Sequence, residues 1–161
     1  MRRPRFSIRR ATRRDVPTIV ALIRGLAEYE RLAHQMEATA DRIRRHGFGA
    51  RRYFEALICR RGGRAVGFAL YFFTYSTFMG RPTLYIEDLF VLPEERGRGA
   101  GKTLLAALAR LAVRRGCGRM EWAVLDWNTP AIRFYKRLGA GLRREWILAR
   151  LAGAPLQRLG R

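Results

Sequence analysis

The stretch ERGRGAGKT, residues 95–103, contains the residue types that hold phosphates in proteins. Three glycines alternate with small or cationic residues, and a Lys-Thr pair then opens an apolar helical pattern. Glycine has no Cβ atom, so consecutive backbone N–H groups can converge on an anion at the start of a helix. Arg96, Arg98 and Lys102 add cationic side chains. The stretch therefore predicts a binding loop for a phosphate or pyrophosphate carried by a larger ligand.

The spacing of the glycines excludes two common phosphate-binding loops. The loop G-x-x-x-x-G-K-[ST] matches at its GKT end, but its first glycine would be residue 96, which is arginine. The dinucleotide fingerprint G-x-G-x-x-G would require glycine at position 102, where the chain has lysine. The pattern that fits is R-x-x-G-x-G at Arg96, Gly99 and Gly101. Taken alone, this pattern leaves open a plain glycine-rich helix entry on a basic surface.

The elements around this loop follow from hydrophobic periodicity. Asp15 is expected to cap the first helix, which ends near Tyr29, and Asn128 is expected to cap the last helix, which ends at Gly139. Two further helices are expected between these two. We expect strands over residues 6–11, 53–60, 65–76, 83–92, 120–125 and 145–151, and the two further helices over residues 38–49 and 102–115. This order predicts an α/β fold in which antiparallel strands precede a β-α-β unit. No repeat or linker interrupts the chain, so residues 1–161 are expected to form a single domain.

The composition is that of a globular protein with a strong basic bias. Hydrophobic residues make up 48% of the chain, and the formal net charge is +20. Such a charge is typical of proteins that bind nucleic acid. The arginines, however, are scattered in pairs rather than gathered into one stripe, and an arginine-biased composition would account for them equally well. A nucleic-acid partner is therefore the less favoured reading, and charge alone does not exclude it.

Other features narrow the setting. No apolar run reaches the length of about 18 residues that a membrane span needs, and the basic N-terminus lacks the apolar core of a signal peptide. Cys59 and Cys117 are too few for a disulfide framework, so we expect a reduced, cytoplasmic protein. His34 and His46 are isolated in the sequence, and no metal site is expected.

Two longer stretches resemble the GNAT acetyltransferase superfamily. They are LYIEDLFVLPEERGRGAGKTLL, residues 84–105, and LDWNTPAIRFYKRLGA, residues 125–140. The first resembles a strand, an acetyl-CoA pyrophosphate loop and a helix, and the N-x-x-A-x-x-F-Y of the second resembles the other CoA motif of that superfamily. IRGLAEYER, HGFG and GFALYFFTYSTFMG are similar to the spermidine/spermine branch, which includes diamine and thialysine acetyltransferases.

This resemblance implies a fold, a reaction and a set of residues. The implied fold is a mixed, mostly antiparallel central sheet with helices on both faces, and the branch forms homodimers. The implied reaction moves the acetyl group of acetyl-CoA to a primary amine by direct attack, with Glu87 as base through a water and Tyr135 as acid. Tyr29, Glu30, Glu87 and Asp88 are implied to bind the acceptor. The residues implied to bind acetyl-CoA are Leu89, Phe90, Val91, Arg96, Gly97, Arg98, Gly99, Ala100, Gly101, Lys102, Asn128, Thr129, Pro130 and Ala131.

The implied chemistry suits these residue types. An ammonium group has a pKa of about 10.4, so only ~0.1% of it is a free nucleophile near pH 7, and a carboxylate base would remove its proton. Apolar neighbours of Glu87 are expected to raise its pKa toward that role. In a regular strand, Glu87 and Asp88 would point to opposite faces, and a bulge of the kind common in this family would turn both toward one cleft.

One departure bears on the acceptor. The branch has an acidic residue and a tryptophan in a stretch that reads FTYSTF here, so Ser76 and Phe78 replace them. The loss of a carboxylate weakens the case for a polyamine and leaves a shorter amine, such as a diamine, thialysine or an amino-acid side chain. Two alternatives also remain open: an acetyltransferase of a protein or ribosomal amine, and a basic nucleic-acid-binding module built on the same fold.

Overall fold

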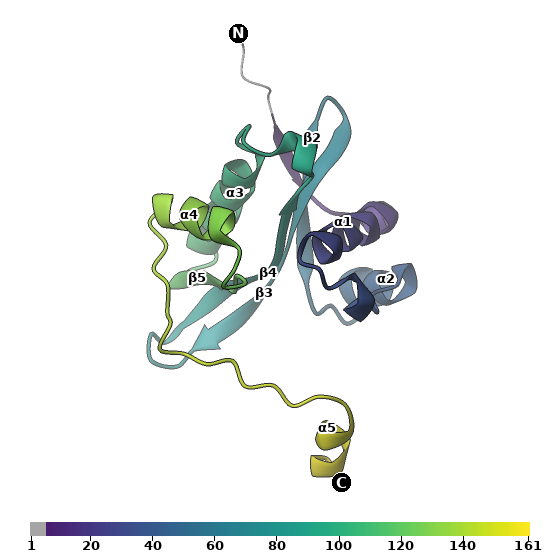
Figure 1. Ribbon diagram of the computed structural model, residues 1–161, viewed down its shortest axis with the longest axis vertical. Coiled ribbons are helices and arrows are strands. Elements are labelled where there is room, and N and C mark those ends of the chain that lie inside the picture. The colour runs from purple at the N-terminus through teal and green to yellow at the C-terminus, as the bar shows by residue number, and fades with distance from the viewer. Residues whose placement is uncertain (1–5) are drawn as a thin grey trace. The chain divides into compact units, whose positions relative to one another are not determined.

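The computed structural model describes residues 6–161 (Figure 1). The chain divides into two compact units, one that ends at Ala123 and one that runs from Val124 to Arg161. No helix of residues 6–161 combines the length and the apolar character that a bilayer crossing requires.

A five-stranded sheet forms the centre of the first unit. Its strands lie in chain order, and they are β1 (Ser7–Arg10), β2 (Glu55–Arg61), β3 (Arg64–Ser76), β4 (Arg81–Val91) and β5 (Arg119–Trp122). The first four pair antiparallel, whereas β5 pairs parallel with β4. The turn between β2 and β3 is made by Gly62 and Gly63, whose φ angles are 54° and 80°, as a tight hairpin requires. The predicted mixed, mostly antiparallel sheet is confirmed.

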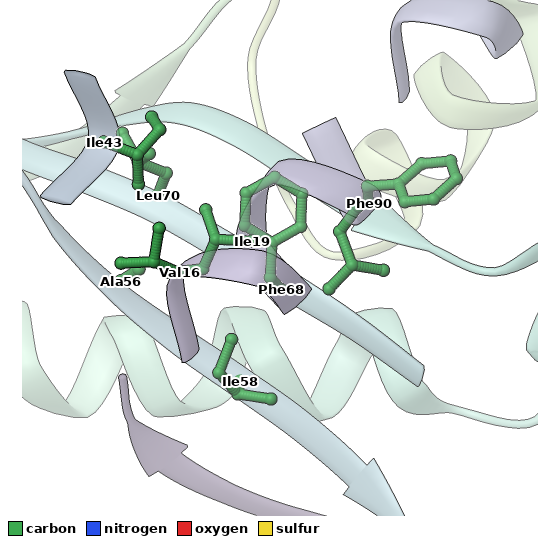
Figure 2. Close-up of a cluster of buried hydrophobic side chains, with 9 residues drawn as sticks. Val16, Ile19, Ile43, Ala56, Ile58, Phe68, Leu70 and Phe90 are labelled. Atoms are coloured by element: carbon green, nitrogen blue, oxygen red, sulfur yellow. The ribbon is translucent and has the colours of Figure 1, made fainter. Parts of the chain in front are cut away.

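Helices cover both faces of this sheet (Figure 1). On one face, α1 (Val16–Tyr29) and α2 (Ala40–Phe48) enclose a core of apolar side chains from β2, β3 and β4. Figure 2 shows this core, which consists of Val16, Ile19, Leu22, Ile43, Ala56, Ile58, Phe68, Leu70 and Phe90. On the other face, α3 (Ala100–Arg114) lies beside Leu57 and Tyr71, which alternate with the core residues along their strands. Because a strand turns successive side chains to opposite faces, β2 and β3 are buried on both sides.

The second unit contains two helices, α4 (Thr129–Arg137) and α5 (Gly153–Leu159). The predicted strand over residues 145–151 is wrong, because no regular structure is assigned there. The pattern that suggested it is apolar, yet Trp146, Ile147 and Leu148 are 73%, 91% and 79% exposed. A strand needs hydrogen bonds from a neighbouring strand, and within residues 6–161 no strand pairs with this segment.

Asp15 does not cap α1 with its side chain, contrary to the sequence prediction. It occupies the N-cap position, but its carboxylate accepts no hydrogen bond from the first turn of α1. It instead accepts from the backbone N–H of Thr12 at 2.7 Å and from both terminal nitrogens of Arg9, at 2.6 and 2.7 Å. These bonds, with the Arg9 pair as the largest contribution, lower the pKa of Asp15 to about 2.

Replacing Asp15 by asparagine should therefore lower the free energy of unfolding by about 2 kcal/mol at pH 7. The pKa of Asp15 is lower in the folded state than in the unfolded one, so its contribution is present above about pH 4 and is lost as the pH falls toward 2. Urea unfolding at pH 7 and at pH 2.5 measures this, and the gap between wild type and variant should shrink at the lower pH. Asp41→Asn, which removes an exposed carboxylate that pairs with Arg45, is the control. An equal difference in the free energy of unfolding at both pH values would contradict a stabilising role for the charge of Asp15.

Candidate active site

A β-bulge in β4 places the acidic pair. Tyr71 of β3 lies opposite Ile86, and the next residue back along β3, Leu70, lies opposite Asp88, which leaves Glu87 without a partner in the ladder. The structure thus contains the irregularity that the resemblance implies. A bulge breaks the strict alternation of side chains and can re-aim one of them. Glu87 is exposed here and Asp88 is partly buried.

Three carboxyl groups form an acidic cluster, which we define as Glu30, Glu87 and Asp88. Burial, followed by the charges of Glu87 and then Glu30, raises the pKa of Asp88 to about 7. Burial also raises the pKa of Glu30, which ends α1 as its C-cap residue. Burial therefore raises the pKa of Asp88, whereas the sequence led us to expect this effect at Glu87. Such a cluster, part of it buried, favours a bound proton or a bound cation.

The bulge also marks the point where β4 loses one of its neighbours. β5 pairs with β4 only from Thr83 to Ile86, so β4 pairs with β3 alone over residues 88–91 among the strands of residues 6–161. We call residues 89–91 the free edge of β4, because no second strand of residues 6–161 pairs with β4 there. The carbonyl of Val91 accepts from Nε of Arg96, and an extended ligand that carries amide groups can pair with the rest of this edge. The pantetheine arm of coenzyme A is such a ligand. The side chain of Phe90 is buried in the core, so this edge offers backbone groups rather than that side chain.

The glycine loop connects this edge to α3. After the short 3-10 helix η3 (Pro93–Glu95), Gly97 and Gly99 adopt φ angles of 72° and 98°, which favour glycine. The N–H of Thr103 donates to the carbonyl of Gly99 at 3.0 Å. The amides of Gly101 and Lys102 lie before that bond, in the first turn of α3, where a helix has no carbonyl to receive them. They are thus free to hold an anion, and this geometry fits the pyrophosphate of acetyl-CoA.

A buried ion pair that the sequence did not reveal supports the loop. Glu95 is 2% exposed, and Arg61 at the end of β2 donates to its carboxylate at 2.6 Å. In the sequence, Glu95 stands in a Pro-Glu-Glu turn that looks solvated, and no local pattern distinguishes it from Glu94. The pairing joins residues 34 positions apart, so only the folded chain reveals it.

Arg96 is oriented in a way that its place in the loop pattern does not suggest. Its guanidinium carbon lies 4.3 Å from the centroid of the Tyr29 ring and 5.4 Å from that of Phe90. Its Nε donates to the carbonyl of Val91 at 2.9 Å. The side chain thus contacts the predicted acceptor residue Tyr29 and the free edge of β4.

The remaining predicted residues lie in the second unit. Asn128 accepts a hydrogen bond from the backbone N–H of Ala131 at 3.4 Å, so its predicted N-cap role is confirmed. The Tyr135 ring lies 5.4 Å from that of Phe134, within α4. The structure groups one set of predicted residues at the start of α4, namely Asn128, Thr129, Pro130 and Ala131. In the first unit it brings together the acidic cluster, the free edge of β4 and the glycine loop.

The two departures from the polyamine branch lie at the hairpin between β3 and β4. Ser76 is buried, and its Oγ accepts a hydrogen bond from the backbone N–H of Met79 at 3.2 Å. Phe78, in the turn itself, is 99% exposed. Ser76 therefore closes the turn and provides no negative charge there. Within residues 6–161, no group of three His, Cys, Asp or Glu side chains is arranged to hold a metal ion.

Comparison with known proteins identifies the class. The model of the acetyltransferase (GNAT) family matches residues 18–140. The chain is 37% identical over 163 residues to thialysine N-epsilon-acetyltransferase of Mus musculus, covering 94% of this chain and 95% of that protein. It is also 48% identical over 91 residues to the L-ornithine N5-acetyltransferase NATA1 of Arabidopsis thaliana, covering 56% of this chain and 40% of that protein.

A solved structure extends the likeness. An integron cassette protein from the mobile metagenome of V. cholerae matches with a TM-score of 0.82 and 26% identity, covering 97% of this chain and 98% of that one. The chain belongs to the GNAT acetyltransferase family, whose members take their acetyl group from acetyl-CoA. It is an N-acetyltransferase, and its curated relatives place it in the spermidine/spermine- and thialysine-acetyltransferase-like branch.

Proposed function

We propose that this protein transfers the acetyl group of acetyl-CoA to the primary amine of a small diamine, polyamine or lysine-like acceptor. The acidic cluster at the β4 bulge is the observation that carries this proposal. Two of its members, Glu87 and Asp88, lie on the strand that leads into the glycine loop, so an acceptor cation and an acetyl donor would meet along β4. Relatives named for thialysine and L-ornithine support an amine on a short aliphatic chain.

Acetyl-CoA would bind through backbone groups. The amides of residues 97–102, with Arg98 and Lys102, would hold the pyrophosphate, and the edge over Leu89, Phe90 and Val91 would pair with the pantetheine arm. The start of α4, from Asn128 to Ala131, would line the path of the arm. Ala100 is buried, so it would contribute its amide rather than its methyl group.

The chemistry would proceed by direct attack. Glu87 would take a proton from the ammonium through a water, and the neutral nitrogen would then attack the thioester carbonyl. The carbon–sulfur bond would break as the amide forms, and Tyr135 would give its proton to the departing thiolate. The attacking nitrogen would lose its second proton to solvent, from which Tyr135 would regain its own. Asp88 and Glu30 would hold the acceptor's positive charge beside Glu87. The exposure of Glu87 supports a relay through water, since solvent reaches it.

The size of the acceptor follows from what the site lacks. With serine at position 76, the hairpin between β3 and β4 has no carboxylate at that position for a distant second or third ammonium. The charge of +20 also repels a long polycation from the rest of the surface. A short amine with one further positive charge, such as thialysine or a diamine, therefore suits the acidic cluster better than spermine.

Release of free thiol tests the proposal. The protein is mixed with acetyl-CoA and, one at a time, with thialysine, ornithine, lysine, putrescine, spermidine and spermine, and the CoA thiol is titrated. We expect the highest kcat/KM with a short amine. An absence of thiol release with every amine, together with no binding of CoA in calorimetry, would refute the proposal.

Replacing Gly99 by alanine should weaken acetyl-CoA binding about tenfold. Gly99 has a φ of 98°, and nothing lies within 4 Å of an added Cβ, so the substitution strains the backbone of the loop without a steric clash. Gly63→Ala is the matched control, because its φ is 80° and its added Cβ also meets nothing. Both variants should lose about 1 kcal/mol of stability. Calorimetry should show weaker binding of acetyl-CoA to Gly99→Ala than to Gly63→Ala. Equal affinities in the two variants would contradict the proposal that the glycine loop binds acetyl-CoA.

We also propose a homodimer that acts in the cytoplasm, with residues 1–161 as a single domain. Trp146, Ile147 and Leu148 are exposed in a row, and contiguous apolar surface of this kind marks contacts with other chains. Both cysteines are free, which supports a reducing compartment. Sedimentation velocity at micromolar concentration tests the dimer, and a monomer would contradict it. Trp146→Asp should shift a dimer toward the monomer.

A further inference from the structure

Arg96 lies in the glycine loop, which would bind the acetyl donor, but its side chain contacts Tyr29, which would bind the acceptor. Its backbone N–H donates to the carbonyl of Pro93 at 3.2 Å and closes the 3-10 helix before the loop. Its side chain extends to the last turn of α1, where the guanidinium lies over Tyr29. One residue therefore joins the glycine loop, β4 and α1.

Each side-chain contact of Arg96 involves either a residue proposed to bind the acceptor or a residue proposed to bind acetyl-CoA. Tyr29 is the last residue of α1 and immediately precedes Glu30 of the acidic cluster, so the Arg96–Tyr29 contact lies beside the residue that carries this carboxylate. The carbonyl of Val91, which accepts from Nε of Arg96, lies at the free edge of β4. The ring of Phe90, the third neighbour, is fixed in the core below. Arg96 is thus held by the predicted acceptor residue Tyr29, by Phe90 and Val91 of β4, and by its own loop.

We propose that Arg96 is a positioning residue that couples the glycine loop to the acceptor-binding residues Tyr29 and Glu30, and that its guanidinium is not a phosphate ligand. The inference rests on the proposed acetyl transfer. The loop that would bind the pyrophosphate also carries Arg96, and the side chain of Arg96 would hold Tyr29 and Glu30 in place for the amine. Because coupling between two sites is reciprocal, a bound amine should tighten acetyl-CoA binding to the same degree.

The chemistry of the side chain suits this role. A planar guanidinium stacks on a ring while its Nε–H remains in the plane to donate to a carbonyl, and the ammonium of lysine cannot do both. A guanidinium can also bind a phosphate bidentately, in a geometry that the ammonium of lysine cannot reproduce. The Kd for CoA of an alanine variant therefore distinguishes the two roles.

The experiment compares Arg96→Ala, Arg96→Lys and, from the same loop, Arg98→Ala. Steady-state kinetics give KM for the short amine with the highest wild-type kcat/KM, and calorimetry gives Kd for CoA. For Arg96→Ala we expect KM for the amine to rise about fivefold, with kcat and Kd for CoA within about twofold. Arg96→Lys should behave like Arg96→Ala. Arg98→Ala should raise Kd for CoA and leave KM for the amine unchanged.

A double-mutant cycle with Tyr29→Leu completes the test. If the two side chains act together, the effects of Arg96→Ala and Tyr29→Leu on KM for the amine will be less than additive. Additive effects, or a Kd for CoA that rises in Arg96→Ala as it does in Arg98→Ala, would overturn the inference while leaving acetyl transfer intact. A wild-type protein that releases no thiol with any amine would overturn both.

Discussion

Replacing Tyr135 by phenylalanine should lower kcat by about 100-fold or more and leave the affinity for acetyl-CoA within about threefold. Protonation by a positioned acid contributes about 10²- to 10⁴-fold to a rate, and the leaving thiolate of coenzyme A would lose this proton donor. The substitution removes one oxygen and keeps the ring, so the packing against Phe134 should persist. The expected pattern is thus a loss in turnover without a loss in binding.

Single-turnover thiol release and calorimetry with CoA measure these two quantities separately. Tyr75→Phe is the matched control, because it removes the same hydroxyl from a side chain that is 65% exposed in β3. It should leave kcat unchanged. Equal losses of kcat and of CoA affinity in Tyr135→Phe would contradict the acid role and indicate that Tyr135 holds the cofactor instead.

The second large effect is expected in the pH dependence of the acidic cluster. The pKa of Asp88 is about 7, so its carboxyl group is mostly neutral below that pH and mostly charged above it. If the charged form holds the acceptor, kcat/KM for the amine should rise through pH 7. In Asp88→Asn the inflection near pH 7 should disappear and KM for the amine should rise. In Glu87→Gln the inflection should remain but move to lower pH, because the charge of Glu87 helps to raise the pKa of Asp88, while kcat falls about 100-fold.

A pH profile of kcat/KM for the wild type and both variants measures this. An inflection that persists in Asp88→Asn and disappears in Glu87→Gln would assign the titrating group to Glu87 and reverse the two roles. Asn and Gln preserve the size of the replaced side chains, so the comparison tests charge and proton transfer rather than packing.

The same group should make stability depend on pH. The pKa of Asp88 is higher in the folded protein than in the unfolded chain, where it is about 3.9. Between these values the folded state holds a proton that the unfolded chain has released, so the free energy of unfolding falls as the pH rises from about 4 to about 7. Asp88→Asn should remove this fall, which urea unfolding across the same pH range detects.

Much of the fold and part of the site follow from the order of residues alone. The spacing of Arg96, Gly99 and Gly101 identified the loop, and the structure has a left-handed glycine and a helix start at those positions. Strands β2, β3 and β4 and helix α1 lie where the apolar periodicity predicted them, within a few residues. These features are local, because glycine conformations and side-chain periodicity depend on neighbours along the chain.

Other features depended on residues far apart in sequence. The burial of Asp88 rather than Glu87 follows from a register shift against β3, and the Arg61–Glu95 pair and the Arg96–Tyr29 contact join separate elements. The segment over residues 145–151 has the composition of a strand, but no strand of residues 6–161 pairs with it. The sequence by itself thus determined the elements, the phosphate loop and the class of reaction. Only the tertiary structure decided which carboxyl group is buried and where Arg96 points, because strand register and long-range contacts are set by the packing of the whole chain.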